Sequence, residues 1–374
     1  MMSLDLDHTM MAKALELAKQ GQGRVEPNPM VGAVIVRDGK IVGKGYHQAY
    51  GGPHAEVFAL QQAGELAHGA TLYVTLEPCC HHGKTPPCTD AIIQAGIKEV
   101  VAAGSDPFPQ VAGSGFSTLA SAGIQIRIDV MRHEAEQLNA PYYKLVRTGL
   151  PYVIAKWAMT LDGKIATASG ESKWISGEES RRMVHELRGR VDGILVGIGT
   201  VLADDPLLTT RPPGPRVATR IVLDTHLKTP ITSQLVKSAR QAPVLLVHAS
   251  NDDKRLAELS GAGCECLRID AASRTESIQQ LLKELGRRRM TNLLVEGGAA
   301  VLGAFFDAKV VDEVWAFIAP KWIGNSSAKS PLSGIGVNSI SPTSQLDDVT
   351  CELVGQDILL RGECIHMDPG KPSV

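Results

Sequence analysis

Cysteine and histidine side chains gather in one short stretch of this sequence. Residues 79–88 read Cys-Cys-His-His-Gly-Lys-Thr-Pro-Pro-Cys, so three thiols and two imidazoles lie within ten residues. Thiolates and imidazoles are the ligands that zinc prefers, and two thiols can also form a disulfide. The stretch therefore predicts a metal site, a disulfide or a shared loop, and the surrounding sequence must decide between them.

The neighbouring elements favour a metal. His54 follows a proline and opens a predicted helix, and Cys88 follows two prolines and opens the next one, while Cys79 follows a predicted strand over residues 71–76. The positive end of a helix dipole favours a thiolate over a thiol, and a metal ligand must be deprotonated. A set of one histidine and two cysteines would leave the fourth zinc position to water, as in catalytic zinc sites.

The order of these residues matches a known catalytic pattern. Zinc deaminases carry His-x-Glu, then Pro-Cys and a second Cys, and their glutamate transfers protons without binding the metal. Glu56 stands two residues after His54 and could reach the metal-bound water. The spacing differs from the pattern, because eight residues separate Cys79 from Cys88 here where the pattern has two.

Taken together, the motifs resemble the deaminase half of the bifunctional riboflavin-biosynthesis proteins. That family joins a diaminohydroxyphosphoribosylaminopyrimidine deaminase to a 5-amino-6-(5-phosphoribosylamino)uracil reductase. The matching motifs are Asn28-Pro29-x-Val31-Gly32, Gly45-Tyr46-His47, His54-Ala55-Glu56 and Glu77-Pro78-Cys79-x-His81-x-Gly83-Lys84-Thr85-Pro86-Pro87-Cys88. The resemblance implies that His54, Cys79 and Cys88 bind zinc and that Glu56 is catalytic. The deaminase substrate contacts that it implies are Asn28, His47, His81 and Lys84.

Two alternatives remain open at this site. Cys80 stands where the family usually has serine, and we expect it not to bind the metal, because adjacent residues cannot easily both point at one ion. Zinc bound by three cysteines is the rival arrangement. A closed structural zinc site, with His81 or His82 as its fourth ligand, is another. We assign His82 no role.

The second half of the chain carries glycine motifs that could bind phosphate. Gly193 to Gly199 fits a dinucleotide-binding fingerprint only in part, because Leu202 stands at the third glycine position. The segment from Glu296 to Gly298 joins a predicted strand to a helix of small residues, where backbone N–H groups could bind an anion. A tight strand–helix turn explains the same residues equally well.

A resemblance to the reductase half of the same family favours the phosphate interpretation. The matching motifs lie at 156–163, 169–175, 200–209, 221–224 and 296–298. This half resembles the dihydrofolate reductase fold and uses NADPH. The implied cofactor contacts are Ala158, Trp174, Thr200, Asp204, Thr225 and the turn of Gly298, Ala299, Ala300, Val301, Leu302, Gly303 and Ala304. The implied substrate contacts are Lys156, Ser172, Arg188, Leu208, Arg211 and Glu296.

Some of these roles have independent chemical support. Arg188 and Arg211 could form forked hydrogen bonds to a substrate phosphate, although Arg188 could instead complement its own helix end. A capping box over residues 176–179 predicts the start of the helix that carries Arg188. Lys156, Asp204 and Glu296 are candidates for proton transfer in the reduction, and the sequence does not rank them.

The resemblance implies two reactions. A zinc-activated hydroxide deaminates 2,5-diamino-6-(5-phosphoribosylamino)pyrimidin-4-one to 5-amino-6-(5-phosphoribosylamino)uracil, and NADPH then reduces the ribosyl group to ribityl. The alternative is a zinc nucleobase deaminase whose C-terminal domain is a non-catalytic specificity domain or binds RNA. The family match also predicts a homo-oligomer, either a dimer or a tetramer.

Composition is ordinary for a soluble globular protein and does not suggest a nucleic-acid surface. The 374 residues are 44% hydrophobic and 21% charged, with a net charge of -2, and they lack the basic clusters of a nucleic-acid surface. No apolar run is long enough to span a bilayer. Acidic residues near the start argue against a signal peptide, so we expect a cytoplasmic protein with reduced thiols.

Alternating strand and helix signals predict two α/β domains that position these residues. The first, over residues 1–145, has helices at 9–19, 53–62 and 89–95, a hairpin at 31–46, and strands at 71–76, 100–103 and 124–128. The family match makes it a cytidine-deaminase-like three-layer α/β/α domain. The second, a dihydrofolate-reductase-like α/β domain over residues 146–367, precedes a loose tail at 368–374. Its strands are predicted at 152–157, 193–198, 220–223, 244–247, 292–295 and 313–318, its helices at 177–188, 276–285 and 299–307, and a last strand or hairpin at 351–361.

Overall fold

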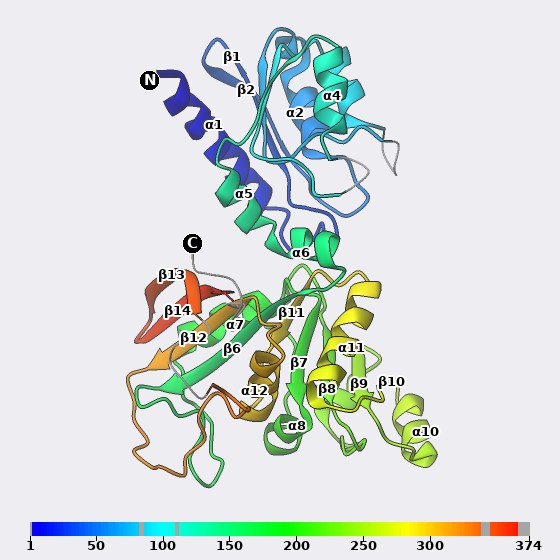
Figure 1. Ribbon diagram of the computed structural model, residues 1–374, viewed down its shortest axis with the longest axis vertical. Coiled ribbons are helices and arrows are strands. Elements are labelled where there is room, and N and C mark those ends of the chain that lie inside the picture. The colour runs from blue at the N-terminus through cyan, green and yellow to red at the C-terminus, as the bar shows by residue number, and fades with distance from the viewer. Residues whose placement is uncertain (1, 82–85, 109–111, 338–344, 366–374) are drawn as a thin grey trace. The chain divides into compact units, whose positions relative to one another are not determined.

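The chain folds into two compact units. The computed structural model describes residues 2–81, 86–108, 112–337 and 345–365, and it divides into Met1–Gly149 and Leu150–Val374 (Figure 1). The segment around the expected border at residue 145 is a helix, α6 (Ala140–Thr148), which belongs to the first unit. The predicted tail at 368–374 lies outside the described residues. No described helix has the length and apolar character needed to cross a membrane.

The described strands of the first unit form one five-stranded sheet in the order β2-β1-β3-β4-β5. β3, β4 and β5 are parallel, and β1 is antiparallel to both β2 and β3, so the sheet is partly parallel. Asp38 and Gly39 both have positive φ, as a two-residue hairpin turn requires. The strands are β1 (Gly32–Arg37), β2 (Lys40–Tyr46), β3 (Thr71–Val74), β4 (Glu99–Ala102) and β5 (Gln125–Arg127).

Helices cover both faces of this sheet because its strands alternate apolar side chains. Val34 and Tyr73 face α1 and α5, whereas Ala33 and Leu72 face α2, α3 and α4. The predicted α/β/α layering is therefore confirmed. The helices are α1 (Met2–Lys19), which begins earlier than predicted, α2 (Ala55–Ala63), η1 (Gly64–Ala67), α3 (Cys88–Gln94), α4 (Ser114–Ser121) and α5 (Arg132–Leu138).

Two glycines of β2 bring α2 unusually close to the sheet. A Cβ atom on Gly43 would lie 2.2 Å from the carbonyl oxygen of Ala59, and one on Gly45 would lie 2.1 Å from that of Ala55. Any side chain at either position would push the helix away from the strand. Because Gly43 and Gly45 lack side chains, α2 can pack directly against β2. This contact sets the position of the N-terminus of α2, where His54 is the N-cap residue.

The described strands of the second unit form a nine-stranded sheet in the order β10-β9-β8-β7-β11-β6-β12-β14-β13. The strands from β10 to β12 in this order are parallel, and β14 and β13 form an antiparallel hairpin at the other end. The strands are β6 (Tyr152–Thr160), β7 (Gly193–Gly197), β8 (Thr219–Leu223), β9 (Val244–His248), β10 (Glu265–Arg268), β11 (Asn292–Val295), β12 (Glu313–Ala319), β13 (Gln345–Val354) and β14 (Asp357–Ile365).

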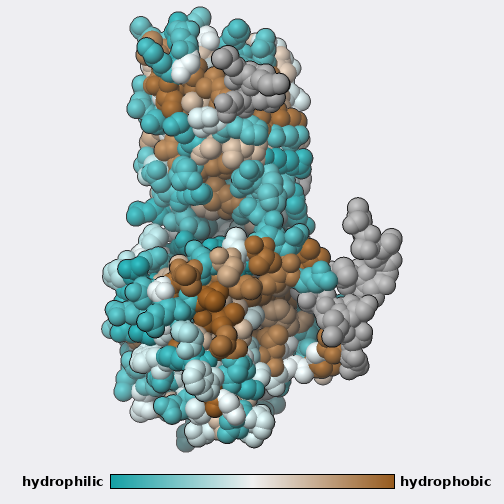
Figure 2. All heavy atoms as spheres, turned by 90° about the vertical axis from the view of Figure 1, so that its left-hand side faces the viewer, coloured by the Kyte–Doolittle hydropathy of each residue, from teal (hydrophilic) through white to brown (hydrophobic). Residues whose placement is uncertain are grey.

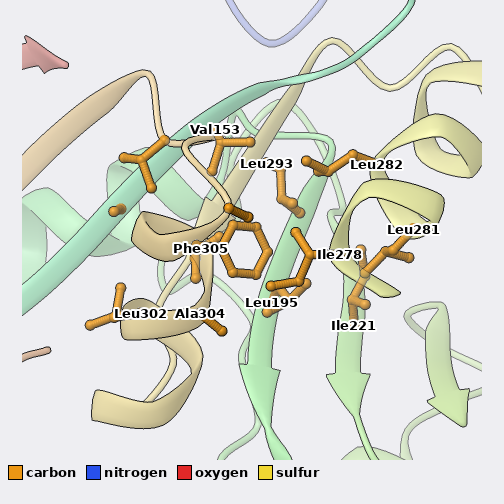
Figure 3. Packing of buried hydrophobic residues seen from close by; sticks show 14 of the residues in the cluster. Val153, Leu195, Ile221, Ile278, Leu281, Leu282, Leu293, Leu302, Ala304 and Phe305 are labelled. Carbon is orange, nitrogen blue, oxygen red and sulfur yellow. The ribbon is translucent and has the colours of Figure 1, made fainter. Parts of the chain in front are cut away.

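Most helices of this unit connect its parallel strands. They are α7 (Glu178–Arg188), α8 (Ile198–Asp204), α9 (Gln234–Lys237), α10 (Asp253–Gly261), α11 (Arg274–Arg287) and α12 (Ala299–Asp307). Among these elements, α7, α11 and α12 were predicted from the sequence, whereas β10, α8, α9 and α10 were not. Figure 3 shows Phe305 of α12 between its helix and the sheet, close to Leu195 and Ile278. This buried contact fixes the N-terminus of α12 beside the end of β11.

The predicted capping box of α7 is wrong. The N-cap residue is Gly177, and it provides no side-chain cap. Instead the buried carboxylate of Asp357 accepts hydrogen bonds from the Gly177 N–H at 2.7 Å and from the Ser180 hydroxyl at 2.6 Å. A residue distant in sequence thus supplies the negative charge that stabilises this helix start, and no local motif could have indicated it.

Candidate active sites

The structure brings the three expected zinc ligands together. His54 is the N-cap residue of α2, Cys88 is the first residue of α3, and Cys79 lies in the loop after β3. The His54 Nδ1 atom lies 3.4 Å from the Cys79 sulfur and 3.3 Å from the Cys88 sulfur, and all three donor atoms lie within 4.8 Å of one another. One imidazole nitrogen and two sulfurs form a donor set that suits zinc.

The electrostatics of this cluster favour a negatively charged sulfur. A hydrogen bond from the Cys88 thiol, together with one from His54, lowers the pKa of Cys79 to about 4. The Cys88 backbone N–H, in the first turn of α3, also donates to the Cys79 sulfur at 3.3 Å. The hydrogen bond to Cys79 in turn raises the pKa of His54. A preformed thiolate is ready to bind a cation without first losing a proton.

Glu56 provides a carboxylate beside the cluster. Its side chain is 3% exposed, and its Oε2 atom is buried without a hydrogen-bond partner among the residues that the structure describes. Burial raises the pKa of Glu56, because the carboxylate loses its hydration there. An unpartnered buried carboxylate oxygen is free to accept and return a proton.

His47 and Asn28 lie next to this cluster in a fixed arrangement. The His47 Nδ1 atom lies 3.0 Å from the Pro53 carbonyl oxygen, so Nδ1 must carry a proton. Its Nε2 atom lies 3.4 Å from the Asn28 side-chain nitrogen and, in the neutral ring, accepts from it. Burial lowers the pKa of His47 and so favours this neutral form. The His47 ring meets His54 edge-on, with 5.3 Å between centroids.

The other expected residues of this site are less clearly placed. Cys80 is half-buried and is not among the described residues that group as metal donors. His81 is exposed, near enough to Asp106 to influence the pKa of that carboxyl. His82 and Lys84 lie outside the described residues.

Sequence reasoning did not assign a role to Glu77, which the structure shows to be an anchor. This buried carboxylate accepts hydrogen bonds from the backbone N–H groups of Asp106 and Gly113 through Oε2, and from those of Gly115 and Phe116 through Oε1. It therefore fixes the start of α4 relative to the loop that carries Cys79. The available signal was a charged residue directly before the Pro-Cys pair.

A largely buried ion cluster marks the second site. Lys156 of β6 and Glu296, which follows β11, are neighbours because Val295 pairs with Ala155 in the parallel register. The Lys156 ammonium lies 3.6 Å from the Glu296 carboxylate, which also accepts from Arg188 Nε at 2.6 Å and Nη2 at 2.9 Å. Burial alone would raise the pKa of Glu296, but Arg188 and Lys156 lower it to about 2.

This geometry changes the expected role of Arg188. Its forked edge, which was expected to bind phosphate, is occupied by Glu296 instead. Arg188 also lies in the last turn of α7, where a positive charge suits the helix end. One carboxylate between two cations leaves the cluster with one excess positive charge, which favours an anionic ligand at this end of the sheet.

The turn before α12 has the features of a phosphate site. Among the described residues no acceptor is found for the backbone N–H groups of Ala299 and Ala300 in the first turn. A Cβ atom on Gly298 would meet nothing nearer than the Thr200 hydroxyl of α8, at 4.0 Å, so the approach to the turn is open. Such N–H groups bind the phosphates of dinucleotides well.

The remainder of the expected turn faces the core. Leu302, Gly303 and Ala304 are buried, and a Cβ atom on Gly303 would lie 2.5 Å from the Ser333 backbone. Among residues 298–304, the first turn of α12 is therefore the part that is not packed into the core.

The other expected cofactor and substrate residues lie on β6, at the end of α8 and in the loops that follow β6, α8 and β8. Ala158 is half-buried on β6, and Thr225 is exposed after β8. The Trp174 side chain is 65% exposed, with the Arg181 guanidinium 4.7 Å from the ring centroid. The remaining four are Ser172, which is half-buried, Asp204, which pairs with Lys173 at 3.6 Å, Leu208, which is buried, and Arg211, which is exposed.

Together these features define a zinc-type deaminase unit joined to a reductase-type α/β unit. Residues 4–104 match the model of the cytidine and deoxycytidylate deaminase zinc-binding region, and residues 151–360 match that of the RibD C-terminal domain. The chain belongs to the family of the riboflavin biosynthesis protein RibD.

Relatives of known name cover nearly the whole chain. The riboflavin biosynthesis protein RibD of Actinobacillus pleuropneumoniae is 44% identical over 95% of this chain and 94% of its own length, and that of Escherichia coli is 42% identical over 96% and 99%. The solved Thermotoga maritima diaminohydroxyphosphoribosylaminopyrimidine deaminase/5-amino-6-(5-phosphoribosylamino)uracil reductase is 36% identical, with a TM-score of 0.85 and coverage of 97% and 100%. An Acinetobacter baumannii RibD structure has a TM-score of 0.84, 36% identity and the same coverage.

These comparisons confirm the predicted family and fold class. The alternative of a non-catalytic or RNA-binding C-terminal domain finds no support, because that half matches the RibD C-terminal domain.

Two adjacent cysteines allow a matched test of the ligand set. We expect Cys79→Ser to lose most of its zinc, because a serine hydroxyl is a much poorer ligand than a thiolate. Cys80→Ser should keep about one zinc per chain, as a three-ligand site with an open position does. Metal analysis of both desalted variants, beside the unaltered chain, measures this. If Cys80→Ser lost its zinc while Cys79→Ser kept it, Cys80 would be the ligand in place of Cys79.

Proposed function

We propose that this chain carries out two successive steps of riboflavin biosynthesis. The first unit deaminates 2,5-diamino-6-(5-phosphoribosylamino)pyrimidin-4-one to 5-amino-6-(5-phosphoribosylamino)uracil. The second unit reduces the ribosyl group to ribityl with NADPH. The observation that carries the proposal is the buried, unpartnered Glu56 oxygen beside the donor set of His54, Cys79 and Cys88. Family membership over the whole chain supports both steps.

In the deamination, His54, Cys79 and Cys88 would hold zinc. Bound zinc lowers the pKa of water towards neutrality and so supplies a hydroxide nucleophile. Glu56 would take the proton released from the water and return it to the ring and to the departing ammonia, which its raised pKa favours. Asn28 and His47 would orient the pyrimidine, because their mutual hydrogen bond fixes which atoms face the site.

In the reduction, NADPH supplies the hydride and the chain aligns donor with acceptor. The open first turn of α12 would bind a cofactor phosphate. Three residues were candidates to supply the proton. Glu296 stays ionised at neutral pH because its pKa is about 2, and Asp204 is paired with Lys173. Burial lowers the pKa of Lys156, so its ammonium is the most ready of the three to give up a proton.

Glu56 can be tested by removing its charge while keeping its shape. We expect Glu56→Gln to lower ammonia release from the diaminopyrimidine by at least about 100-fold, the usual contribution of a general acid and base. Zinc content should remain that of the unaltered chain, since Glu56 is not in the donor set. Glu65→Gln, an exposed change in the same unit, is the control. Deamination by the Glu56 variant at an undiminished rate would remove this residue from the mechanism.

Arg188 can be tested through the substrate dependence of the reductase. We expect Arg188→Ala to raise the KM for the phosphorylated uracil intermediate by about tenfold, with little change for NADPH, because the excess positive charge of the cluster disappears. Arg182→Ala, at an exposed position of the same helix, is the matched control. NADPH oxidation, followed at varied concentrations of each substrate, measures the KM for the uracil intermediate and the KM for NADPH separately. Equal increases in both KM values would assign Arg188 a structural role.

We propose further that the protein is a cytoplasmic homo-oligomer, a dimer or a tetramer, without a nucleic-acid partner. The hairpin of β13 and β14 ends the sheet of the second unit and exposes apolar side chains, with Val349, Leu353 and Ile365 at 52%, 78% and 43% exposure. Figure 2 shows hydrophobic side chains gathered on this side of the unit. An exposed apolar edge of this kind is typical of a subunit contact.

The oligomer can be tested at this hairpin. Light scattering should give a mass of at least two chains for the unaltered protein. Leu353→Asp should shift it towards one chain, because a charge in an apolar contact is costly to desolvate. Leu66→Asp, a change at another exposed leucine in the first unit, should leave the mass unchanged. A single-chain mass for the unaltered protein would contradict the proposal.

A further inference from the structure

The loop after α8 carries several of the proposed reductase contacts and is held at three points. The proposed contacts are Asp204, at the end of α8, Leu208 and Arg211. Residues 205–210, here called the clamp loop, run from Asp204 to Arg211 and include Leu208. Leu208 is buried at a φ of 53°, a left-handed conformation that leucine seldom adopts. A loop with such a residue keeps its shape only when its surroundings hold it.

The first anchor is a buried arginine. Arg220 of β8 is fully buried, yet among the described residues no carboxylate pairs with it. Its Nη1 atom donates to the Leu207 carbonyl oxygen at 3.1 Å and to the Ser238 hydroxyl at 2.7 Å, and its Nη2 atom donates to the carbonyl oxygens of Ser238 and Ala242. A buried charge that binds only neutral acceptors is costly, so an apolar side chain would fill this space more cheaply unless the carbonyl groups of Leu207, Ser238 and Ala242 needed these hydrogen bonds.

Two further anchors flank the first. At one end, the Asp205 carboxylate accepts from the Gln234 backbone N–H at 2.8 Å, and the Asp205 carbonyl oxygen accepts from the Gln234 side chain at 2.5 Å. At the other end, the Thr210 hydroxyl donates to the carbonyl oxygen of His185 in α7, at 2.7 Å. Leu208 lies between the anchors at Leu207 and Thr210, and Arg211 directly follows the last one.

We propose that Arg220 and Gln234 are positioning residues of the reductase, which hold the clamp loop so that Leu208 and Arg211 meet the phosphorylated substrate. This inference rests on the proposed function of the second unit. In this proposal neither residue contacts the substrate: Arg220 is enclosed by the fold, and Gln234, exposed at the start of α9, is bound to Asp205. Their effect on catalysis passes through the backbone of the loop that they bind.

The test compares both KM values of the reductase in Gln234→Ala, Arg220→Lys and Arg220→Met. Loss of one loop hydrogen bond in Gln234→Ala should raise the KM for the uracil intermediate about three- to tenfold, and the arginine variants should raise it more. Among the arginine variants, lysine keeps the charge and should be the milder change. The KM for NADPH should change by less than about twofold. Gln241→Ala, an exposed glutamine outside the loop contacts, is the control.

Three measurements separate positioning from damage to the fold. Ammonia release by the first unit should be unchanged. All four tryptophans, at 157, 174, 315 and 322, lie in the second unit, so their fluorescence reports its folding alone. Amide hydrogen exchange over residues 205–210 should become faster in Gln234→Ala than in Gln241→Ala. Because Gln234 is exposed, this variant stays informative even where Arg220→Met fails to fold.

The outcomes are distinct. Equal increases in both KM values, or unchanged kinetics and unchanged exchange in Gln234→Ala, would overturn the positioning proposal. An unaltered chain that never oxidises NADPH with the uracil intermediate would overturn the proposed reductase function instead. In that case, amide hydrogen exchange over the clamp loop in Gln234→Ala would still decide whether the loop is held by these contacts. Unchanged exchange would overturn the positioning proposal as well.

Discussion

The zinc-type site depends on how closely one helix approaches one strand. Gly43 and Gly45 allow the backbone of α2 to lie against β2, where any Cβ atom would collide with helix carbonyl groups. That contact sets the N-terminus of α2, and with it the His54 ring. The two cysteines reach the same point from β3 and α3, which belong to the same core as α2. The donor set is thus a consequence of backbone packing, because side-chain length alone could not correct a displaced helix.

In the second unit a different constraint gathers the site. The carboxyl ends of parallel strands reach the same edge of a sheet, so residues that follow neighbouring strands become neighbours in space. β11 lies between β6 and β7, which brings Lys156, Glu296 and the start of α8 together although they are far apart in the chain. The order of strands thus creates both the ion cluster and the open turn at α12. No single residue of the ion cluster or of the turn indicates a site by itself in the sequence.

Sequence patterns were sufficient where short-range rules decide the structure. Prolines before His54 and Cys88 marked helix starts, and the hairpin predicted at 31–46 is present, because these effects act over a few residues. They failed where distant residues compete. Asp357 caps α7 in place of the expected Ser176, and Glu296 occupies the fork of Arg188. The helices α8 and α9 were missed because they are short. The helix α10 was missed because Leu259 is the one buried residue described in it, so its sequence carries little apolar periodicity.

Buried charges explain why the site loops keep their shape. Glu77 in the first unit binds four backbone N–H groups, and Arg220 in the second binds backbone carbonyl oxygens. Each holds an irregular segment next to a site, where no helix or strand could satisfy the backbone groups. A neutral side chain could provide only one or two such bonds, whereas a carboxylate accepts several and a guanidinium donates several. The charge is therefore stabilised by the loop that it orders, and the loop in turn depends on the charge.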